Sequence, residues 1–440
     1  MILAVLDDLM FSSKIKTAAN GLGVDLRFSR SVDGAIETMR KNPTTLVILD
    51  LNNERIGPLA IVAAMKADPA LASIPTVGYA SHVQTDVINA ARQAGVGEVL
   101  ARSAFVQQLA EILTRQPKNA GATTMIDVLR ARRRIAPYIR RTPLIHSAWL
   151  SDLAGASISL KPESLQRSSS FKSRGAFNAV IARLERPGGA PARLVTASAG
   201  NHGRGLAAAA NTFNLPLVVF TPKDAPAAKL DAIRRDGADL RPDGRDYDDA
   251  ERMAKAFAAD TGAEFISPYN DPDVIAGAAT VALEIFEDEP AIDTLMVPIG
   301  GGGLISGVAT VAKAIDPRCE VIGVEVEASN PFQQSVRAGT LVEIVPGATL
   351  ADGLGGNPDP DTITFAFIQR LVDRIVTVSE GDLAAAIVGL DEAEHLIAEG
   401  AGAAATAALV GKRLEVRDRR VAVIVSGGNI DRARLAGLLS

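Results

Sequence analysis

The chain has 440 residues and a formal net charge of −5, and this length is enough for more than one hydrophobic core. No basic block stands out, so we do not expect nucleic acid as a partner. The single cysteine, Cys319, excludes an intramolecular disulfide and a cysteine-based metal cluster. No charge-free apolar run reaches the roughly 18 residues of a membrane helix, and the apolar start Met1 to Leu6 has no basic lead. We therefore expect a cytoplasmic protein without a membrane partner.

Residues 1–117 alternate between strand-like and helix-like stretches. The strand-like stretches are 2–6, 24–28, 46–49, 76–79 and 98–100, and the helix-like ones are 12–22, 32–40, 57–67, 84–94 and 104–113. Five such units predict an α/β domain with a parallel, doubly wound sheet. Such sheets carry their sites at the carboxyl ends of strands, where Asp7, Asp8 and Asp50 fall.

This arrangement resembles the flavodoxin-like receiver domain of response regulators. The resemblance places Asp7 and Asp8 at the acidic pair and Asp50 at the phospho-acceptor position. It departs at two positions, because Ala80 stands where the family has a switch Ser or Thr, and Arg102 where it has a lysine. We therefore favour a degenerate receiver-like domain that binds a signalling partner over one that is phosphorylated.

A polar stretch of small residues, 118–124, follows and is typical of a linker. The second region, 125–440, opens with an expected amphipathic helix over 126–139.

Lys172 lies where a loop is expected to become a helix. Residues 158–160 end like a strand, and residues 175–184 have the apolar spacing of a helix. An ammonium group at a helix N-terminus is disfavoured by the helix dipole, and burial favours the neutral amine. A neutral amine is the form that reacts with a carbonyl to give a Schiff base.

Three turns rich in small residues each follow a strand-like run. They are Ser198-Ala199-Gly200-Asn201-His202-Gly203, Gly300-Gly301-Gly302-Gly303 and Ser426-Gly427-Gly428-Asn429. Small residues between a strand and a helix expose backbone N–H groups to an anion. We expect the first turn to bind a carboxylate and the four glycines to bind a phosphate.

Together with Lys161 to Gln166 and Ser170 to Ala176, these turns occur in an order that resembles the fold-type II pyridoxal phosphate (PLP) enzymes. Within them, the motifs are similar to those of the threonine/serine dehydratases and serine racemase. The resemblance covers residues 125–440 and implies a tryptophan synthase β-like fold of one large and one small α/β domain. The small domain would be a mobile part of the chain at about 193–270. A homodimer is also implied.

The resemblance further implies a role for each motif residue. Lys172 would hold PLP and then remove the Cα proton of the substrate. The cofactor contacts would come from Phe171, Lys172, Asn201, Gly300, Gly301, Gly302, Gly303 and Ser426. The substrate carboxylate would be bound by Ser198, Asn201 and His202.

Two residues favour elimination. Ser426 would face the pyridine nitrogen, and a neutral hydroxyl makes the ring a weaker electron sink than a carboxylate does, which favours loss of the β-hydroxyl. Ala199 stands where serine racemase has the serine of its second acid/base group, and alanine transfers no proton. We therefore expect an ammonia-lyase that converts L-threonine and L-serine to a 2-oxo acid and ammonia.

Three alternatives stay open at this point. They are a lyase for another β-hydroxy amino acid, such as 3-hydroxyaspartate or phenylserine, a serine racemase-like enzyme, and an amino-acid-binding sensor. For a monovalent or divalent cation, Glu325 matches a glutamate of the family, but Pro331 stands where a second carboxylate is expected. One carboxylate is a poor site for a hard cation.

Overall fold

The computed structural model describes residues 1–440 apart from 23, 43, 54, 69–70, 72–73, 82–83, 115–122 and 187–188. The chain divides into two compact units, Met1–Ala122 and Thr123–Ser440. Most of the linker predicted at 118–124 lies outside the described residues. Its last residue, Thr124, belongs to the second unit, where its side chain accepts a hydrogen bond from the N–H of Asp127 and caps a helix.

The first unit is a five-stranded parallel sheet in the order β2-β1-β3-β4-β5. Its strands are β1 (Ile2–Val5), β2 (Leu26–Ser29), β3 (Leu46–Asp50), β4 (Thr76–Ala80) and β5 (Glu98–Ala101). Its helices are α1 (Leu9–Gly21), α2 (Val32–Lys41), α3 (Pro58–Ala67), α4 (Thr85–Ala94), α5 (Arg102–Gln107) and α6 (Leu109–Thr114). This is the doubly wound sheet expected from the alternation, and apolar clusters cover both of its faces.

Two helix boundaries in this unit differ from the prediction. The first helix begins at Leu9 because Asp8 caps it, accepting a 2.9 Å hydrogen bond from the N–H of Phe11. The helix predicted over 104–113 is interrupted at Gln108 and forms the two short helices α5 and α6.

The second unit contains two sheets. Its strands are β6 (Ile145–His146), β7 (Ser157–Pro162), β8 (Leu194–Ala197), β9 (Leu217–Pro222), β10 (Asp239–Gly244), β11 (Glu264–Phe265), β12 (Thr294–Pro298), β13 (Glu320–Val326), β14 (Arg374–Val378) and β15 (Arg420–Val425). The larger sheet has the order β14-β13-β12-β15-β7-β6 and is parallel except for β6. The smaller sheet has the order β10-β9-β8-β11 and is parallel throughout.

Helices cover both faces of each sheet, as parallel sheets require. They are α7 (Met125–Ile135), α8 (Ala148–Ala154), α9 (Lys172–Leu184), α10 (Asn201–Thr212), α11 (Ala227–Arg235), α12 (Tyr247–Thr261), α13 (Pro272–Asp288), α14 (Gly303–Ile315), α15 (Pro331–Ala338), α16 (Thr364–Leu371), α17 (Glu380–Glu394), α18 (Gly400–Val410) and α19 (Arg432–Leu439). Three 3-10 turns complete the unit: η1 (Glu163–Leu165), η2 (Arg167–Ser169) and η3 (Asp352–Leu354). Among the described helices, none is both long and apolar enough to cross a membrane.

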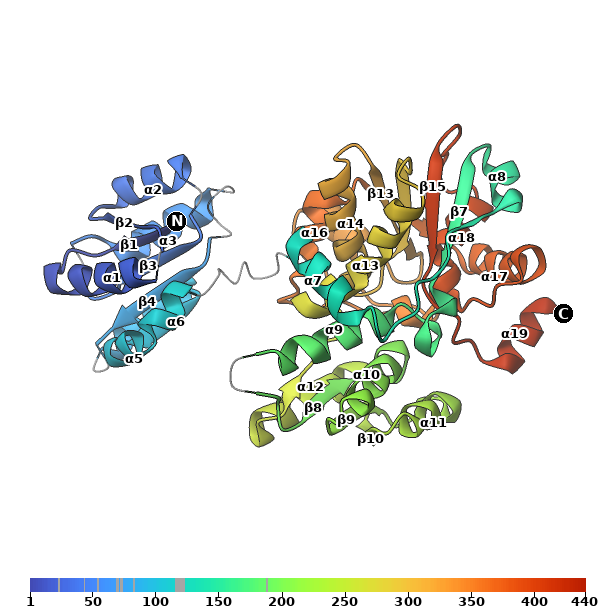
Figure 1. Ribbon diagram of the computed structural model, residues 1–440, viewed down its shortest axis with the longest axis horizontal. Helices are drawn as coiled ribbons and strands as arrows, with labels where there is room; N and C mark the ends of the chain where they lie inside the picture. The colour runs from blue at the N-terminus through green and yellow to red at the C-terminus, as the bar shows by residue number, and fades with distance from the viewer. Residues whose placement is uncertain are drawn as a thin grey trace. The chain divides into compact units, whose positions relative to one another are not determined.

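The smaller sheet is formed by residues 194–265, inside the segment 193–270 expected to form a small domain. Its strands lie beside α10, α11 and α12 in Figure 1. The segment thus has its own sheet and one apolar cluster of its own, and it shares a second cluster with α9.

A buried ionic group fixes the start of α9. The Arg174 guanidinium donates to Glu163 and to Glu284, each at 2.7 Å, and Lys161 donates to Glu284 at 2.8 Å. All four side chains are buried, and the two positive charges balance the two negative ones. Removing one member of such a group leaves an unpaired buried charge, so the group holds α9 in one place.

Candidate active site

A cleft of about 1470 Å³ in the second unit brings the predicted site residues together. It is lined by Phe171, Lys172, Ser198, Asn201, His202, Gly300, Gly301, Gly302, Gly303 and Ser426. These residues come from four separate segments of the chain, which follow β7, β8, β12 and β15. Parallel sheets gather such segments because their strands end on the same edge.

Lys172 is the first residue of α9, as predicted for a loop-to-helix junction. Its Nζ donates a 2.8 Å hydrogen bond to the carbonyl oxygen of Pro268. Burial lowers the pKa of Lys172 to about 8. A carbonyl does not neutralise the ammonium as a carboxylate would, so the amine is poised to lose its proton near neutral pH.

Phe171 precedes this lysine and lies against the end of the last strand. Its backbone N–H donates to the carbonyl oxygen of Ser426 at 3.1 Å, and its ring centre is 5.2 Å from the Nζ of Lys172. The Ser426 hydroxyl is buried and donates to the carbonyl oxygen of Ala401 at 3.3 Å. Both residues are therefore held beside the lysine.

The turn between β8 and α10 carries Ser198 and His202. The Ser198 hydroxyl accepts a hydrogen bond from the N–H of Gly200 at 3.2 Å. The His202 side chain is 2% exposed, and burial, with the Lys172 charge acting in the same direction, lowers its pKa to about 3. His202 is therefore neutral at any ordinary working pH.

The four glycines form the turn between β12 and α14. Gly302 has a φ of 83°, in the left-handed region that glycine favours. A Cβ on Gly301 would lie 2.3 Å from the ring of Tyr269, so a side chain has no room there. The turn leads into the N-terminus of the 13-residue helix α14, where free backbone N–H groups suit a phosphate.

These groups fit PLP. An amine with a lowered pKa suits the aldehyde of the cofactor, and the glycine turn at a helix N-terminus suits its phosphate.

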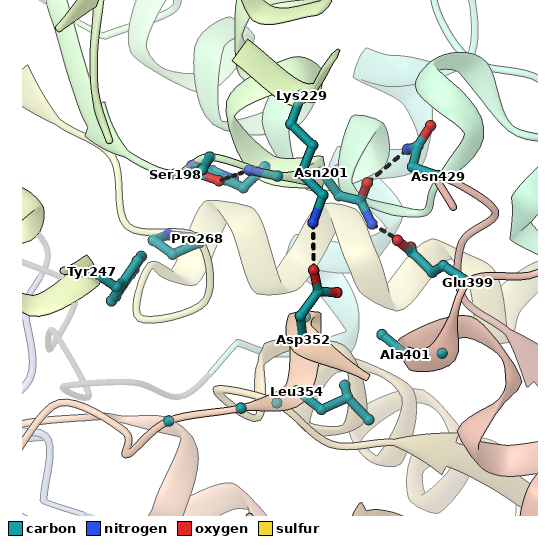
Figure 2. Close-up of a pocket in the computed structure, with 18 of the residues that line it drawn as sticks. Ser198, Asn201, Lys229, Tyr247, Pro268, Asp352, Leu354, Glu399, Ala401 and Asn429 are labelled. Carbon is teal, nitrogen blue, oxygen red and sulfur yellow. Dashed lines mark hydrogen bonds and ion pairs between the residues drawn. The ribbon is translucent and has the colours of Figure 1, made fainter. Parts of the chain in front are cut away.

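Two interactions at the cleft were not predicted from the sequence. Glu399 accepts a 2.5 Å hydrogen bond from the Nδ2 of Asn201, and Lys229 forms an ion pair with Asp352 (Figure 2). Glu399 is not among the residues to which the sequence motifs assign a role. The pair of Lys229 and Asp352 joins α11 to η3 across 123 residues, and no local signal in the sequence indicates it.

Glu325 lies outside this cleft. Its two carboxylate oxygens accept the backbone N–H groups of Phe332 and Gln333 at 3.0 and 2.7 Å, at the start of α15. Burial raises its pKa to about 7. Within the described part of the chain, no group of three or more His, Cys, Asp or Glu side chains could hold a metal ion. The glutamate thus serves a helix N-terminus here.

In the first unit, Asp50 ends β3 and is 8% exposed. Burial raises the pKa of its carboxyl group, and one oxygen accepts the N–H of Asn52 at 3.1 Å. Asp7 and Asp8 follow β1, and both pair with arginines. The closest of these pairs joins Asp8 to Arg102 at 2.6 Å.

Comparison with known proteins agrees with the geometry of the cleft. An L-threonine ammonia-lyase of Thermotoga maritima is 41% identical over 310 residues, 70% of this chain and 76% of that protein. An L-threo-3-hydroxyaspartate ammonia-lyase of Saccharomyces cerevisiae is 40% identical over 316 residues, 71% of this chain and 95% of that protein. The structure of maize serine racemase aligns with a TM-score of 0.67 at 32% identity, over 72% of this chain and 96% of the racemase chain.

The model of one family, the pyridoxal-phosphate dependent enzymes, matches residues 135–427. The match spans the predicted site residues in the cleft, from Phe171 to Ser426. The chain therefore belongs to the pyridoxal-phosphate dependent enzymes, and PLP is its cofactor.

Proposed function

We propose that the chain is an ammonia-lyase that converts L-threonine and L-serine to a 2-oxo acid and ammonia by β-elimination. The observation that carries this proposal is the cleft that Lys172, with its lowered pKa, lines together with the glycine turn and Ala199. Relatives at about 40% identity that are named ammonia-lyases support the reaction class. When bound, PLP supplies an electron sink that eases removal of the Cα proton.

Lys172 acts as the base in this proposal. Its Nζ accepts the Cα proton of the substrate, which an amine with a pKa of about 8 can do near neutral pH. The Cβ–O bond then breaks, and the hydroxyl group leaves as water with the proton that the Lys172 Nζ had accepted, so the amine is neutral again. The released unsaturated amine takes up water and gives the 2-oxo acid and ammonia, so the atoms balance without a further reactant.

The substrate carboxylate lies at the turn before α10 in this proposal. Ser198, Asn201 and His202 line that side of the cleft, and the N-terminus of a 12-residue helix favours a negative charge. The neutral ring of His202 leaves the carboxylate to be bound by hydrogen bonds rather than by a second positive charge.

Ala199 also lines the cleft and has no group that can return a proton to Cα. This favours elimination over racemisation. Ser426 adds to the preference, because its buried hydroxyl is engaged by the carbonyl oxygen of Ala401 and is neutral.

The test is release of 2-oxo acid by the full chain with added PLP. The panel is L-threonine, L-serine, both 3-hydroxyaspartates and phenylserine, with D-serine formation measured alongside. We expect release from threonine and serine, and D-serine at no more than a small fraction of turnover. Release from 3-hydroxyaspartate alone would make that amino acid the substrate, as in the name of the Saccharomyces cerevisiae relative. Amino acid binding without any release would instead favour a sensor.

For the first unit we propose a receiver-like domain that binds a signalling partner without being phosphorylated. The strand order of the sheet and the position of Asp50 at the end of β3 support the likeness to a receiver. Arg102 forms an ion pair with Asp8. Its guanidinium takes the carboxylate that would otherwise bind the metal ion used in phosphorylation, and this supports a domain that is not phosphorylated.

We propose residues 1–117 and 125–440 as separate domains, the segment 193–270 as a mobile part of the second, and a homodimer as the assembly. A chain that starts at Thr123 should fold and keep turnover within about twofold of the full chain, because the second unit has its own apolar cores. Turnover and sedimentation of both chains test these points. An insoluble short chain would make the first unit a structural requirement.

A further inference from the structure

Glu399 is the N-cap residue of α18, yet its side chain does not cap that helix. A carboxylate at this place would gain from the free N–H groups and from the helix dipole. Instead, Glu399 turns to the cleft and is only 7% exposed. A buried carboxylate that forgoes a helix cap must be held by another interaction.

That interaction is a chain of hydrogen bonds through Asn201 (Figure 2). The Nδ2 of Asn201 donates to Glu399 at 2.5 Å, and the Oδ1 of Asn201 accepts from the Nδ2 of Asn429 at 2.6 Å. Asn429 also donates to the carbonyl oxygen of Ser168 at 2.8 Å and accepts from Arg204.

The two neighbours of Asn201 fix which way its amide points. An asparagine amide can turn over and exchange its donor and acceptor ends. Here Glu399 requires the donor end and Asn429 the acceptor end, so only one orientation satisfies both. One N–H of Asn201 is left for a ligand in the cleft.

Glycine at position 427 makes room for this contact. A Cβ on Gly427 would lie 2.1 Å from the Oε1 of Glu399, and the backbone N–H of Glu399 donates to the carbonyl oxygen of Gly427 at 3.1 Å. The turn at 426–429 therefore has space for the Glu399 carboxylate because residue 427 is glycine.

Charged groups around Glu399 have opposing effects. Burial is the largest effect and raises its pKa to about 7, while the hydrogen bond from Asn201 and the charges of Lys229 and Arg204 lower it. Asp352 is the nearby carboxylate that raises it. The glutamate therefore exchanges its proton near neutral pH, and the bond from Asn201 is stronger when Glu399 is ionised.

We propose that Glu399 is a positioning residue that orients the amide of Asn201 toward the bound cofactor. This inference rests on the family's cofactor and on the contact that the resemblance assigns to Asn201. It adds a residue to the site that no motif assigned, and it explains why three separate turns meet at one amide.

The experiment compares two variants of the full chain, Glu399→Leu and Glu399→Gln. The readouts are the affinity of the apo-protein for PLP and the visible absorption spectrum of the bound cofactor between pH 6 and 8.5. Glu399→Leu should weaken PLP affinity about tenfold, since it removes a hydrogen bond to a charged group. The spectrum of the original chain should change around pH 7, where Glu399 exchanges its proton. Glu399→Gln should lose this change and keep affinity within about threefold.

Glu394→Gln is the matched control, because Glu394 accepts a 2.5 Å hydrogen bond from Ser147 outside the cleft. It should leave both readouts as in the original chain. If Glu399→Leu does not fold, Asn429→Asp tests the same point: aspartate cannot donate to Asn201, and PLP affinity should weaken as expected for Glu399→Leu.

Unchanged affinity and spectrum in Glu399→Leu, or in a folded Asn429→Asp, would overturn the inference. The proposed function fails separately. A chain that binds PLP with the expected dependence on Glu399 but releases no 2-oxo acid would contradict the ammonia-lyase and leave the role of Glu399 standing.

Discussion

Both units of the chain place polar side chains at the ends of parallel strands, but they treat them differently. In the first unit, Asp7 pairs with Arg30 and Arg55, and Asp8 pairs with Arg102. In the cleft of the second unit, Lys172 donates to the backbone carbonyl oxygen of Pro268.

The difference shows what to look for in a site. Carboxylates that already form ion pairs within the chain are less available to bind a ligand. Among the described residues, no carboxylate pairs with the buried amine of Lys172, and the glycine turn that lines the same cleft leads into a helix N-terminus, so both can bind a ligand. We therefore expect substitutions in the cleft to have large effects on turnover and PLP affinity, and a substitution of Asp50 to have a small one.

The largest effect is expected from Lys172→Ala. Turnover should fall by at least about a thousandfold, because both the covalent link to PLP and the base are lost. The melting temperature of the apo-protein should not fall, because a partly unpaired buried amine contributes little to stability. Lys313→Ala is the control, since Lys313 pairs with Asp373 away from the cleft. Normal turnover in Lys172→Ala would contradict the whole assignment.

A smaller effect is expected from Gly301→Ala. The added Cβ would lie 2.3 Å from the ring of Tyr269, and overpacking of this kind costs about 1–3 kcal/mol. PLP affinity, measured by titration of the apo-protein, should weaken about tenfold or more as the turn shifts. Gly355 lines the same cleft, but a Cβ there would make ordinary contacts at 3.7 Å or more. The PLP affinity of Gly355→Ala should therefore change less. Equal effects in the two variants would argue against a rigid phosphate turn.

The pH dependence of PLP uptake gives a third test. The pKa of Lys172 is lowered to about 8, so half of the amine is in the reactive neutral form at about pH 8 and nearly all of it about one pH unit higher. The rate at which apo-protein takes up PLP, followed by absorbance, should reach half its maximum near pH 8 and level off about one pH unit higher. An ordinary exposed lysine would keep gaining up to about pH 10.4. A rate that still rises at pH 9.5 would show that the amine is not buried.

The smallest effect is expected from Asp50→Asn. Turnover should stay within about twofold, and stability should be unchanged or slightly higher, because burial already disfavours the charged form. Thermal melting and 2-oxo acid release measure both. Mass spectrometry of the original chain after incubation with acetyl phosphate and Mg²⁺ sharpens the comparison. A phosphoryl group on Asp50 would show that the arginines do not close this site.

Local pattern was sufficient for the elements that flank the motifs. The strand 194–197, the glycine turn before α14 and the start of a helix at Lys172 follow from apolar spacing and small residues. The region between β13 and β15 was not predicted in detail. There α17 and α18 pack on the larger sheet, and the alanine-rich α18 is buried almost all round, so it shows no helical periodicity.

The sequence by itself determined the family, the cofactor and the motif residues that meet in the cleft, because each motif is a short local pattern with its own chemistry. Tertiary structure alone decided how these motifs support one another. Glu399, Asn201 and Asn429 are more than 25 residues apart, and Lys229 is 123 residues from Asp352. Hydrogen bonds and ion pairs over such separations depend on strand order and helix packing, which no local pattern encodes.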